Sequence, residues 1–347
     1  MNRKTPKTTD GLMRHIRDNK GIQINGSTEK NQLRNIGYFH GFKGYNFFLN
    51  KEEELNFEKF SELHALYSFD TEIKNLFYKH VMFCETAIKN RLLEIVCVNS
   101  GFDLDSLFQK SLTYYKSYSP GSSKYKKHLK NTTRLRRDIY DMIHEHCNSK
   151  PYIYHYIHQD RTVPLYAVFE LFTLGNLVFF TRCMSQNLNI EAQKQLKLYS
   201  PAFDQSKDIL GDIIDCMKGL RNAIAHNGVL YDCRFKTGET SNRLKEYLAV
   251  KMDIHNLDFD RIIDYLILLI LICSGLSYSK AELQRIIRQF EQNLDFLRSK
   301  ISESTYDKII GVRARPKLRS LKNFINNLDF YLLICQFKCN SSSHKTS

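Results

Sequence analysis

The stretch DTEIKNLFYKHVMFCETAIKNRLLEIVCV, residues Asp70 to Val98, decides the fold class. Its apolar residues recur mostly at steps of three and four, the spacing of one face of an α-helix. Similar patterns follow at Pro164 to Met184, Leu196 to Gly228 (one or two helices), Leu257 to Leu276 and Ser279 to Ser299. Glycines and prolines that would punctuate strands are few. The sequence therefore predicts an all-α fold.

The organisation along the chain is read from composition. Ser100 to Arg137, which has Pro-Gly and serines at its centre, and Leu230 to Asn242 are read as loops, but neither is polar enough for a linker. We expect an N-terminal helical extension (1–60) packed on the core and one helical domain (61–300) with a basic insertion at about 100–160. A C-terminal helical tail (301–347) completes the expected arrangement.

Charge and cysteine usage limit the classes of function. The chain has 51 Lys and Arg against 37 Asp and Glu, a net charge of +14, which attracts phosphate-bearing partners. Nucleic acid is the first class of partner to consider, and an anionic membrane surface the second. Nine cysteines without a C-x-x-C pair fit neither a disulfide framework nor a zinc knuckle, and they indicate a reducing compartment.

No targeting or membrane-spanning segment is expected. The basic, polar start of the chain lacks the apolar core of a secretory or transit signal. The longest apolar run, Tyr265 to Leu276, is about half of the ~20 residues that cross a bilayer. We therefore expect a buried helix there, a cytoplasmic location and no membrane partner.

The segment LRNAIAHNGVLYD, Leu220 to Asp232, carries the candidate chemistry. Asn222 and His226, four residues apart, share one helix face, whereas Arg221 and His226 diverge by about 140°. Arg221 and His226 converge only if the helix is distorted or if two copies of the segment meet across an interface. A guanidinium holds phosphate at any working pH, and an imidazole moves protons near neutrality. The combination suits cleavage of RNA.

The expected reaction needs no metal and no cofactor. The ribose 2′-hydroxyl attacks the adjacent phosphate and leaves a cyclic phosphate and a free 5′-hydroxyl. His226 would act as general base or acid, Arg221 would stabilise charge on the phosphate oxygens, and Asn222 would orient the histidine or hold a phosphate. The spacing alone is not specific, because one Arg-x-x-x-x-His pair is expected on the order of once by chance in such a chain.

RNAIAHNGVLYD resembles the Arg-Asn-x-x-x-His motif of HEPN-domain ribonucleases. Three further stretches resemble the AbiD and AbiF group of the Abi family of bacterial abortive-infection proteins. They are LRNIGYFHGFKGYNFF (Leu33 to Phe48), YSFDTEIKNLFYKHVMFCETAIKNRL (Tyr67 to Leu92) and VPLYAVFELFTLGNL (Val163 to Leu177). The matches follow the family's order from about Gly21 to Asp232. This sequence lacks the tryptophan that the family often has at Leu165-Tyr166, a packing position.

The resemblance implies a HEPN-like helical bundle and antiphage defence through RNA cleavage, with composite active sites at a homodimer interface. It also implies similarity to the HEPN halves of RNA-guided type VI CRISPR effectors and a cognate noncoding RNA as partner. In related HEPN domains polar residues of the earlier helix face the motif helix. Glu85 and Arg91 are therefore expected to hold Arg221 or His226 in place, while Glu85 and Lys89 have the spacing of a helical ion pair.

A basic segment, residues 110–137, contains no acidic residue and interleaves cations with tyrosines. This pattern suits single-stranded or looped RNA, and a solvated surface is the alternative interpretation. The expected RNA-binding residues are Lys124, Lys126, Lys127, Lys130, Arg134, Arg136 and Arg137. The segment RARPKLRSLK, Arg313 to Lys322, is a weaker patch of the same kind.

Three further interpretations stay open. The cluster HEHC, His144 to Cys147, with His155 and His158 matches no zinc spacing, and no metal site is expected. The aromatic residues of 38–48 either pack the extension on the domain or stack on bases. The alternative to a nuclease is a catalytically silent RNA-binding HEPN module that acts as scaffold or sensor.

Overall fold

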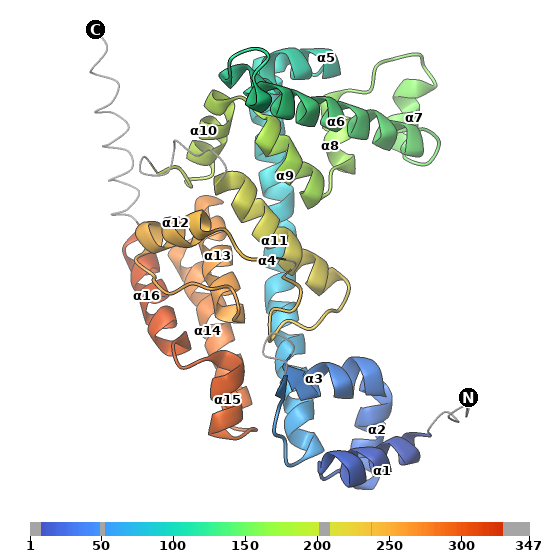
Figure 1. The fold of residues 1–347 in the computed structure, drawn as a ribbon, viewed down its shortest axis with the longest axis vertical. Coiled ribbons are helices and arrows are strands. Elements are labelled where there is room, and N and C mark those ends of the chain that lie inside the picture. Colours follow the sequence, from blue (N-terminus) through green and yellow to red (C-terminus); the bar gives the residue numbers. More distant parts are fainter. Residues whose placement is uncertain (1–7, 49–52, 201–208, 237, 329–347) are drawn as a thin grey trace.

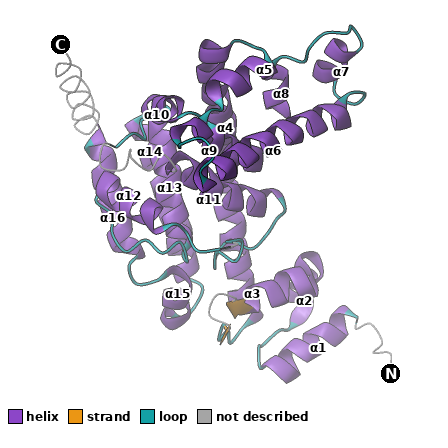
Figure 2. Cartoon of the chain, turned by 45° about the horizontal axis from the view of Figure 1, so that its top comes forward, coloured by secondary structure: helices purple, strands orange, loops and turns teal. Residues whose placement is uncertain are grey.

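The computed structural model describes residues 8–48, 53–200, 209–236 and 238–328, and the predicted all-α fold is confirmed. Helices make up nearly all regular structure in these ranges, as Figure 2 shows. The exception is a short antiparallel pair, β1 (Phe47–Phe48) and β2 (Glu53–Glu54). Within the described part of the chain no helix is both long and apolar enough to cross a membrane.

Helix α4 (Phe60–Ser100) is the axis of the molecule. Its 41 residues extend about 60 Å, and the other elements pack along it (Figure 1). The predicted helix over Asp70 to Val98 is confirmed and begins ten residues earlier. The Glu62 carboxylate accepts the main-chain N–H groups of Glu58 and Lys59, which satisfies donors at the start of the helix.

The N-terminal elements cluster at one end of α4 (Figure 1). They are α1 (Thr9–Lys20), α2 (Gly26–Ile36), the π-helix η1 (Gly37–Lys43) and α3 (Gly44–Asn46). Their buried side chains belong to the same continuous hydrophobic core as those of α4. Gly41 permits the tight α2–η1 corner, since a Cβ there would lie 2.3 Å from the Ile36 side chain.

The opposite end of α4 carries the elements from residue 104 to 195 (Figure 1). They are α5 (Leu104–Ser106), η3 (Leu107–Ser111), η4 (Tyr114–Ser117), α6 (Ser123–His146), α7 (Pro151–Ile157), α8 (Leu165–Leu171), α9 (Leu174–Cys183) and α10 (Gln186–Gln195).

Two sequence predictions at this end were wrong. The expected loop from Ser100 to Arg137 contains three short helices and the first half of α6, which begins because the Ser122 hydroxyl accepts the Tyr125 N–H at 3.1 Å. The expected helix from Pro164 to Met184 is two helices, α8 and α9. Thr173 interrupts it, since its side chain and that of Asn176 form a capping box that starts α9.

The remaining helices are α11 (Ile209–Ala225), α12 (Asn242–Met252), α13 (Ile262–Gly275), α14 (Lys280–Arg298), α15 (Glu303–Ile310) and α16 (Ala314–Asn326). Of these, α11, α13 and α14 pack on α4, and α12, α15 and α16 pack on those three (Figure 1). The helices predicted at Leu257 to Leu276 and Ser279 to Ser299 correspond to α13 and α14. Helix α13 is buried on nearly all sides, which explains its long apolar run. Of the expected tail, residues 329–347 lie outside the described ranges.

His80 couples the stability of the fold to pH. Its side chain, on α4, is 3% exposed, and its Nδ1 atom lies 3.1 Å from the Tyr278 hydroxyl just before α14. Burial lowers the pKa of His80 to about 4. Lys79 and Arg285 act in the same direction, and Glu282 opposes them. The folded state therefore holds a neutral imidazole.

We predict that His80 makes the protein acid-sensitive between pH 6.5 and 4. An imidazole in the unfolded chain titrates near 6.5, so the stabilisation is complete above that pH and is lost as the pH falls to about 4. Between pH 7 and 4 the free energy of unfolding should fall by up to about 3 kcal/mol more in wild type than in His80→Gln. Urea unfolding at both pH values measures the difference, and equal decreases would contradict the assignment.

Candidate active site at the end of helix α11

The candidate motif lies where α11 ends. Arg221 and Asn222 are in its last turns, and the His226 N–H still donates to the Asn222 carbonyl at 3.0 Å. Asn227 then adopts the left-handed conformation, with φ of 53°, and the Gly228 N–H donates to the Ala223 carbonyl at 2.7 Å. This is the Schellman arrangement, which asparagine tolerates well. The His-Asn-Gly sequence thus stops the helix directly after the histidine and leaves His226 exposed.

A buried carboxylate fixes Arg221. The Arg221 Nε atom donates to Glu85 Oε2 on α4 at 2.9 Å, and Arg221 Nη1 lies 3.3 Å from Asn222 Oδ1. Glu85 is 7% exposed, whereas about a third of the Arg221 side chain remains accessible. Glu85 therefore orients the guanidinium toward Asn222 and neutralises part of its charge.

The three residues singled out on α4, Glu85 and Arg91 as supports of the motif and Lys89 as an ion-pair partner of Glu85, have different positions. Glu85 contacts Arg221 directly. Lys89 is half-buried, and within the described residues the Glu85 carboxylate is paired with Arg221 rather than with Lys89. Arg91 donates from Nη1 to the Gln195 carbonyl at 2.6 Å. That bond ties α4 to the end of α10 and places Arg91 away from the contacts expected with Arg221 or His226.

A cleft of about 570 Å³ opens beside α11. Asn222 and His226 line it, together with residues of α9, residues 235, 236 and 238–241, and residues of α12 and α13, whereas Arg221 is not among its lining residues. Its charged residues are three cations and three carboxylates, namely Arg182, Lys218, Lys236, Asp212, Asp215 and Glu239. The chain thus directs Arg221 toward Glu85, and Asn222 and His226 toward the cleft.

The cleft contains one thiol. Cys216, one helical turn and a half before Asn222, is partly buried against Tyr265. Burial raises the pKa of the Cys216 thiol to about 12. It is therefore protonated at neutral pH and is a poor nucleophile. The side chains lining the cleft that can transfer protons include the imidazole of His226 and the carboxylates of Asp212, Asp215 and Glu239.

A buried polar network holds the chain that leaves α11. The Asp70 carboxylate accepts the N–H groups of Leu230 and Tyr231 at 2.8 and 2.7 Å and the Tyr45 hydroxyl at 2.7 Å. Lys74 forms an ion pair with Asp70 at 2.9 Å. Asp70 is completely buried, so these donors replace the water that a carboxylate needs.

The network extends to the motif itself. Lys74 Nζ donates to Asn227 Oδ1 at 3.0 Å, and Asn227 Nδ2 lies 3.4 Å from His40 Nε2 on η1. The sequence analysis did not identify Asp70, Lys74 or His40. The available signal was the Asp70–Lys74 pair, four residues apart on a helix face that is otherwise apolar.

The predicted RNA-binding cations lie on α6, and all seven side chains are exposed. The three arginines of its second half are paired: Arg134 and Arg137 with Asp138, and Arg136 with Asp105. Lys126, Lys127 and Lys130 have no carboxylate partner among the described residues.

The interleaved tyrosines are half-buried and pack on one another. The rings of Tyr118 and His128 stack at 5.1 Å, and Tyr115 meets Tyr125 edge-on at 5.5 Å. Lys124 lies over the Tyr118 ring at 5.8 Å. The free lysines of the first half of α6 are therefore its strongest feature for binding phosphate.

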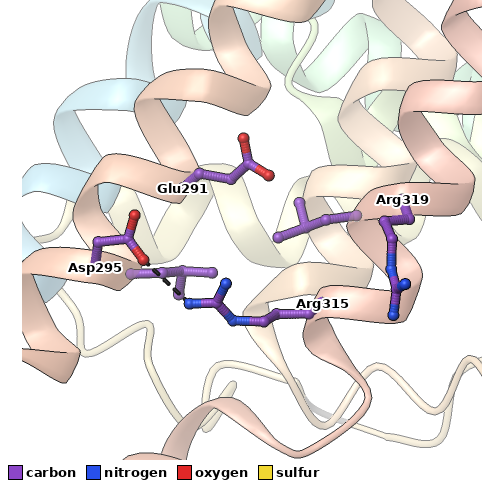
Figure 3. Close-up of a pocket in the computed structure, with 6 residues that line it drawn as sticks. Glu291, Asp295, Arg315 and Arg319 are labelled. Carbon is purple, nitrogen blue, oxygen red and sulfur yellow. Dashed lines mark hydrogen bonds and ion pairs between the residues drawn. The ribbon is translucent and has the colours of Figure 1, made fainter.

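The weaker basic patch, Arg313 to Lys322, is largely neutralised. Figure 3 shows Arg315 reaching Asp295 across a hollow of about 410 Å³ between α14 and α16. Lys322 pairs with Glu291, and the buried Lys317 pairs with Asp264 at 2.6 Å. These contacts hold α16 on α13 and α14, so most of the patch joins helices.

The histidines considered for metal binding are spread over several elements. His144 and His146 lie in the last turn of α6, His155 lies in α7, and His158 follows it. His146 Nδ1 lies 3.2 Å from the Ser149 hydroxyl. In the described part of the chain no three His, Cys, Asp or Glu side chains are grouped as a metal site would require.

The comparison with known families identifies the chain. Searches of curated proteins and of solved structures found no match. The family model described as Abi-like protein matches residues 31–232, more than half of the 347-residue chain. The matched range includes His40, Asp70, Glu85 and the motif from Arg221 to His226, and it ends before α12. The chain therefore belongs to the Abi-like protein family, which points to abortive infection, a form of phage defence.

Proposed function

We propose that this protein is a metal-independent endoribonuclease of a phage-defence system, with a HEPN-type active site formed by Arg221, Asn222 and His226. The observation that carries the proposal is the buried Glu85, which orients Arg221 next to a cleft that Asn222 and His226 line. Burying a carboxylate is costly, and apolar residues would join α4 to α11 at least as well. An oriented guanidinium beside an accessible imidazole is what phosphoryl chemistry requires.

The proposed reaction uses the 2′-hydroxyl of the substrate as nucleophile. The 2′-oxygen bonds to the phosphorus while the bond from phosphorus to the 5′-oxygen breaks, which leaves a 2′,3′-cyclic phosphate and a 5′-hydroxyl. His226 either takes the proton of the 2′-hydroxyl or gives one to the leaving 5′-oxygen, and water exchanges the other proton. Arg221 stabilises the charge that develops on the phosphate oxygens. Asn222, which lies between Arg221 and the cleft, holds a phosphate oxygen or aligns the imidazole.

The proposed active unit is a homodimer. Within one chain Arg221 faces Glu85 while His226 faces the cleft, so the two groups have different surroundings. If a second copy places its α11 against the α11 of the first, the Arg221 of one chain can meet the His226 of the other. This arrangement agrees with the composite sites that the HEPN resemblance implies.

The proposed partner is RNA, both as substrate and as a cognate noncoding RNA. The exposed lysines of α6 support it, because unpaired cations on a helix attract phosphates without recognising a sequence. The same lysines support the second candidate function, a catalytically silent RNA-binding module, since they would bind RNA without the motif. Cleavage therefore discriminates between the two candidates.

We predict that His226→Ala and Arg221→Ala each lower RNA cleavage by about 10²- to 10⁴-fold, because each removes a reacting group. Cleavage by purified wild type should persist in a chelator and give cyclic phosphate ends. His255→Ala, which changes another exposed histidine, serves as the control and should retain activity. Full activity of either motif variant would refute the assignment, and loss of wild-type activity in the chelator would indicate a metal-dependent reaction.

A matched pair of substitutions on α4 tests whether the orientation of Arg221 matters for cleavage. Glu85→Gln removes the charge that holds Arg221, and Glu94→Gln changes an exposed carboxylate of the same helix. Misplacing a reacting group typically costs about 10²-fold. We expect that loss in kcat, with little change in KM, for the Glu85 variant alone. Equal activity of the two variants would show that Glu85 has only a structural role.

We also predict that the first half of α6 dominates the salt dependence of RNA binding. Replacing Lys126, Lys127 and Lys130 with glutamine should flatten the log-log salt slope by up to about 2, at roughly 0.7 for each lost phosphate contact. Arg136→Gln with Arg137→Gln should change it less, because both arginines are paired. Titrations use the His226→Ala protein and single-stranded RNA. An unchanged slope in the lysine variant would place the RNA elsewhere.

A further inference from the structure

The N-terminal extension exposes one aromatic ring beside the motif. Of the aromatic side chains in residues 38–48, Phe42, Tyr45 and Phe48 are buried and pack the extension on the core. Phe39 differs, since it is 76% exposed. A single exposed apolar side chain is common on protein surfaces, so the case for a binding function rests on the neighbours of Phe39.

The local structure explains why Phe39 points outward. Residues 37–43 form a π-helix, whose hydrogen bonds span five residues instead of four. The wider turn keeps Phe42 in the core while Phe39 projects to solvent. Tyr38 supports the exposed ring edge-on at 5.5 Å and stacks in turn on Phe42 at 5.4 Å. Phe39 therefore rests on a packed aromatic base.

A cation lies beside Phe39. Lys43 Nζ lies 5.1 Å from the centre of the Phe39 ring. The same Nζ atom lies 5.6 Å from the centre of the Tyr38 ring, and among the described residues Lys43 has no carboxylate partner. An exposed ring next to an unpaired ammonium group suits a nucleobase and its phosphate.

The segment that carries Phe39 contacts the chain at the end of the motif. His40, the residue after Phe39, lies 3.4 Å from the Asn227 amide, and Asn227 follows His226 directly. The segment that follows η1 also approaches the chain that leaves α11, since a Cβ at Gly44 would lie 3.6 Å from Val229. His40 therefore links the segment that carries Phe39 to the residue directly after His226.

We propose that Phe39, with Lys43, is a stacking site for a base of single-stranded RNA that flanks the bond at His226. The identity of the ligand rests on the proposed function, but the site is separate from the reacting groups. Its chemistry favours a nucleic acid over a protein surface. A single ring beside an ammonium group lacks the contiguous apolar area that a protein contact buries.

The test uses the absence of tryptophan from this sequence. Phe39→Trp places a single tryptophan at the proposed stacking site. The protein also carries His226→Ala, so that the RNA stays intact. Phe296→Trp, at a ring on α14 that is 40% exposed, is the matched control. Titration with a single-stranded RNA of about 12 nucleotides should quench the tryptophan fluorescence of the Phe39→Trp protein by stacking and leave that of the Phe296→Trp protein unchanged.

Affinity gives a second readout. Phe39→Leu keeps an apolar side chain and removes the aromatic face, so the Kd should rise roughly 5- to 150-fold with an unchanged salt slope. Phe39→Trp, which keeps an aromatic face, should bind RNA with the affinity of the protein that has phenylalanine at this position. Lys43→Gln should instead flatten the salt slope by roughly 0.7.

Three results would overturn the proposal. They are unchanged affinity of Phe39→Leu, absence of quenching at saturating RNA, and a change in oligomeric state of Phe39→Leu without a change in affinity, which would make Phe39 a protein contact. All measurements use protein that cannot cleave, so they are independent of the nuclease assignment. A wild type that binds RNA at Phe39 and cuts none would refute the nuclease alone.

Discussion

The buried carboxylate of Asp70 is the constraint on which the rest of the structure depends. It accepts hydrogen bonds from Tyr45 of the N-terminal extension and from the main chain of Leu230 and Tyr231, and it pairs with Lys74. Three segments far apart in sequence thus meet at one side chain. Removing it would leave an unpaired ammonium group and two unsatisfied N–H groups in the core, at a cost on the order of several kcal/mol.

Helix α4 controls both parts of the candidate site. Glu85 orients Arg221 within α11, while Asp70 and Lys74 fix the chain just after His226. Asp70 and Glu85 are fifteen residues apart, about 22 Å along the axis and within about 60° around it. One face of one helix therefore positions the arginine and the histidine, although the two groups have different surroundings. Such preorganisation is what electrostatic stabilisation of a transition state requires.

Sequence reasoning succeeded where the determinants are local. The helical spacing of α4 and the apolar run of α13 both predicted helices that the structure contains. It failed at α6, where charged residues obscure the buried positions Thr132, Leu135, Ile139 and Ile143. It also failed at Thr173, a cap inside an apolar run. The contacts of Asp70 with Leu230 and of His40 with Asn227 join residues 160 and 187 positions apart, which no periodicity encodes.

The central claim is that the substrate's own 2′-hydroxyl attacks the phosphate, with Arg221 and His226 as the reacting groups of the protein. The most direct measurement maps a bond that wild type cuts in a short RNA and then replaces the single 2′-hydroxyl at that bond with hydrogen. The account predicts that cleavage at this bond disappears while the modified RNA binds with the same affinity. Cleavage at the 2′-deoxy position would contradict it, since the nucleophile would then come from elsewhere.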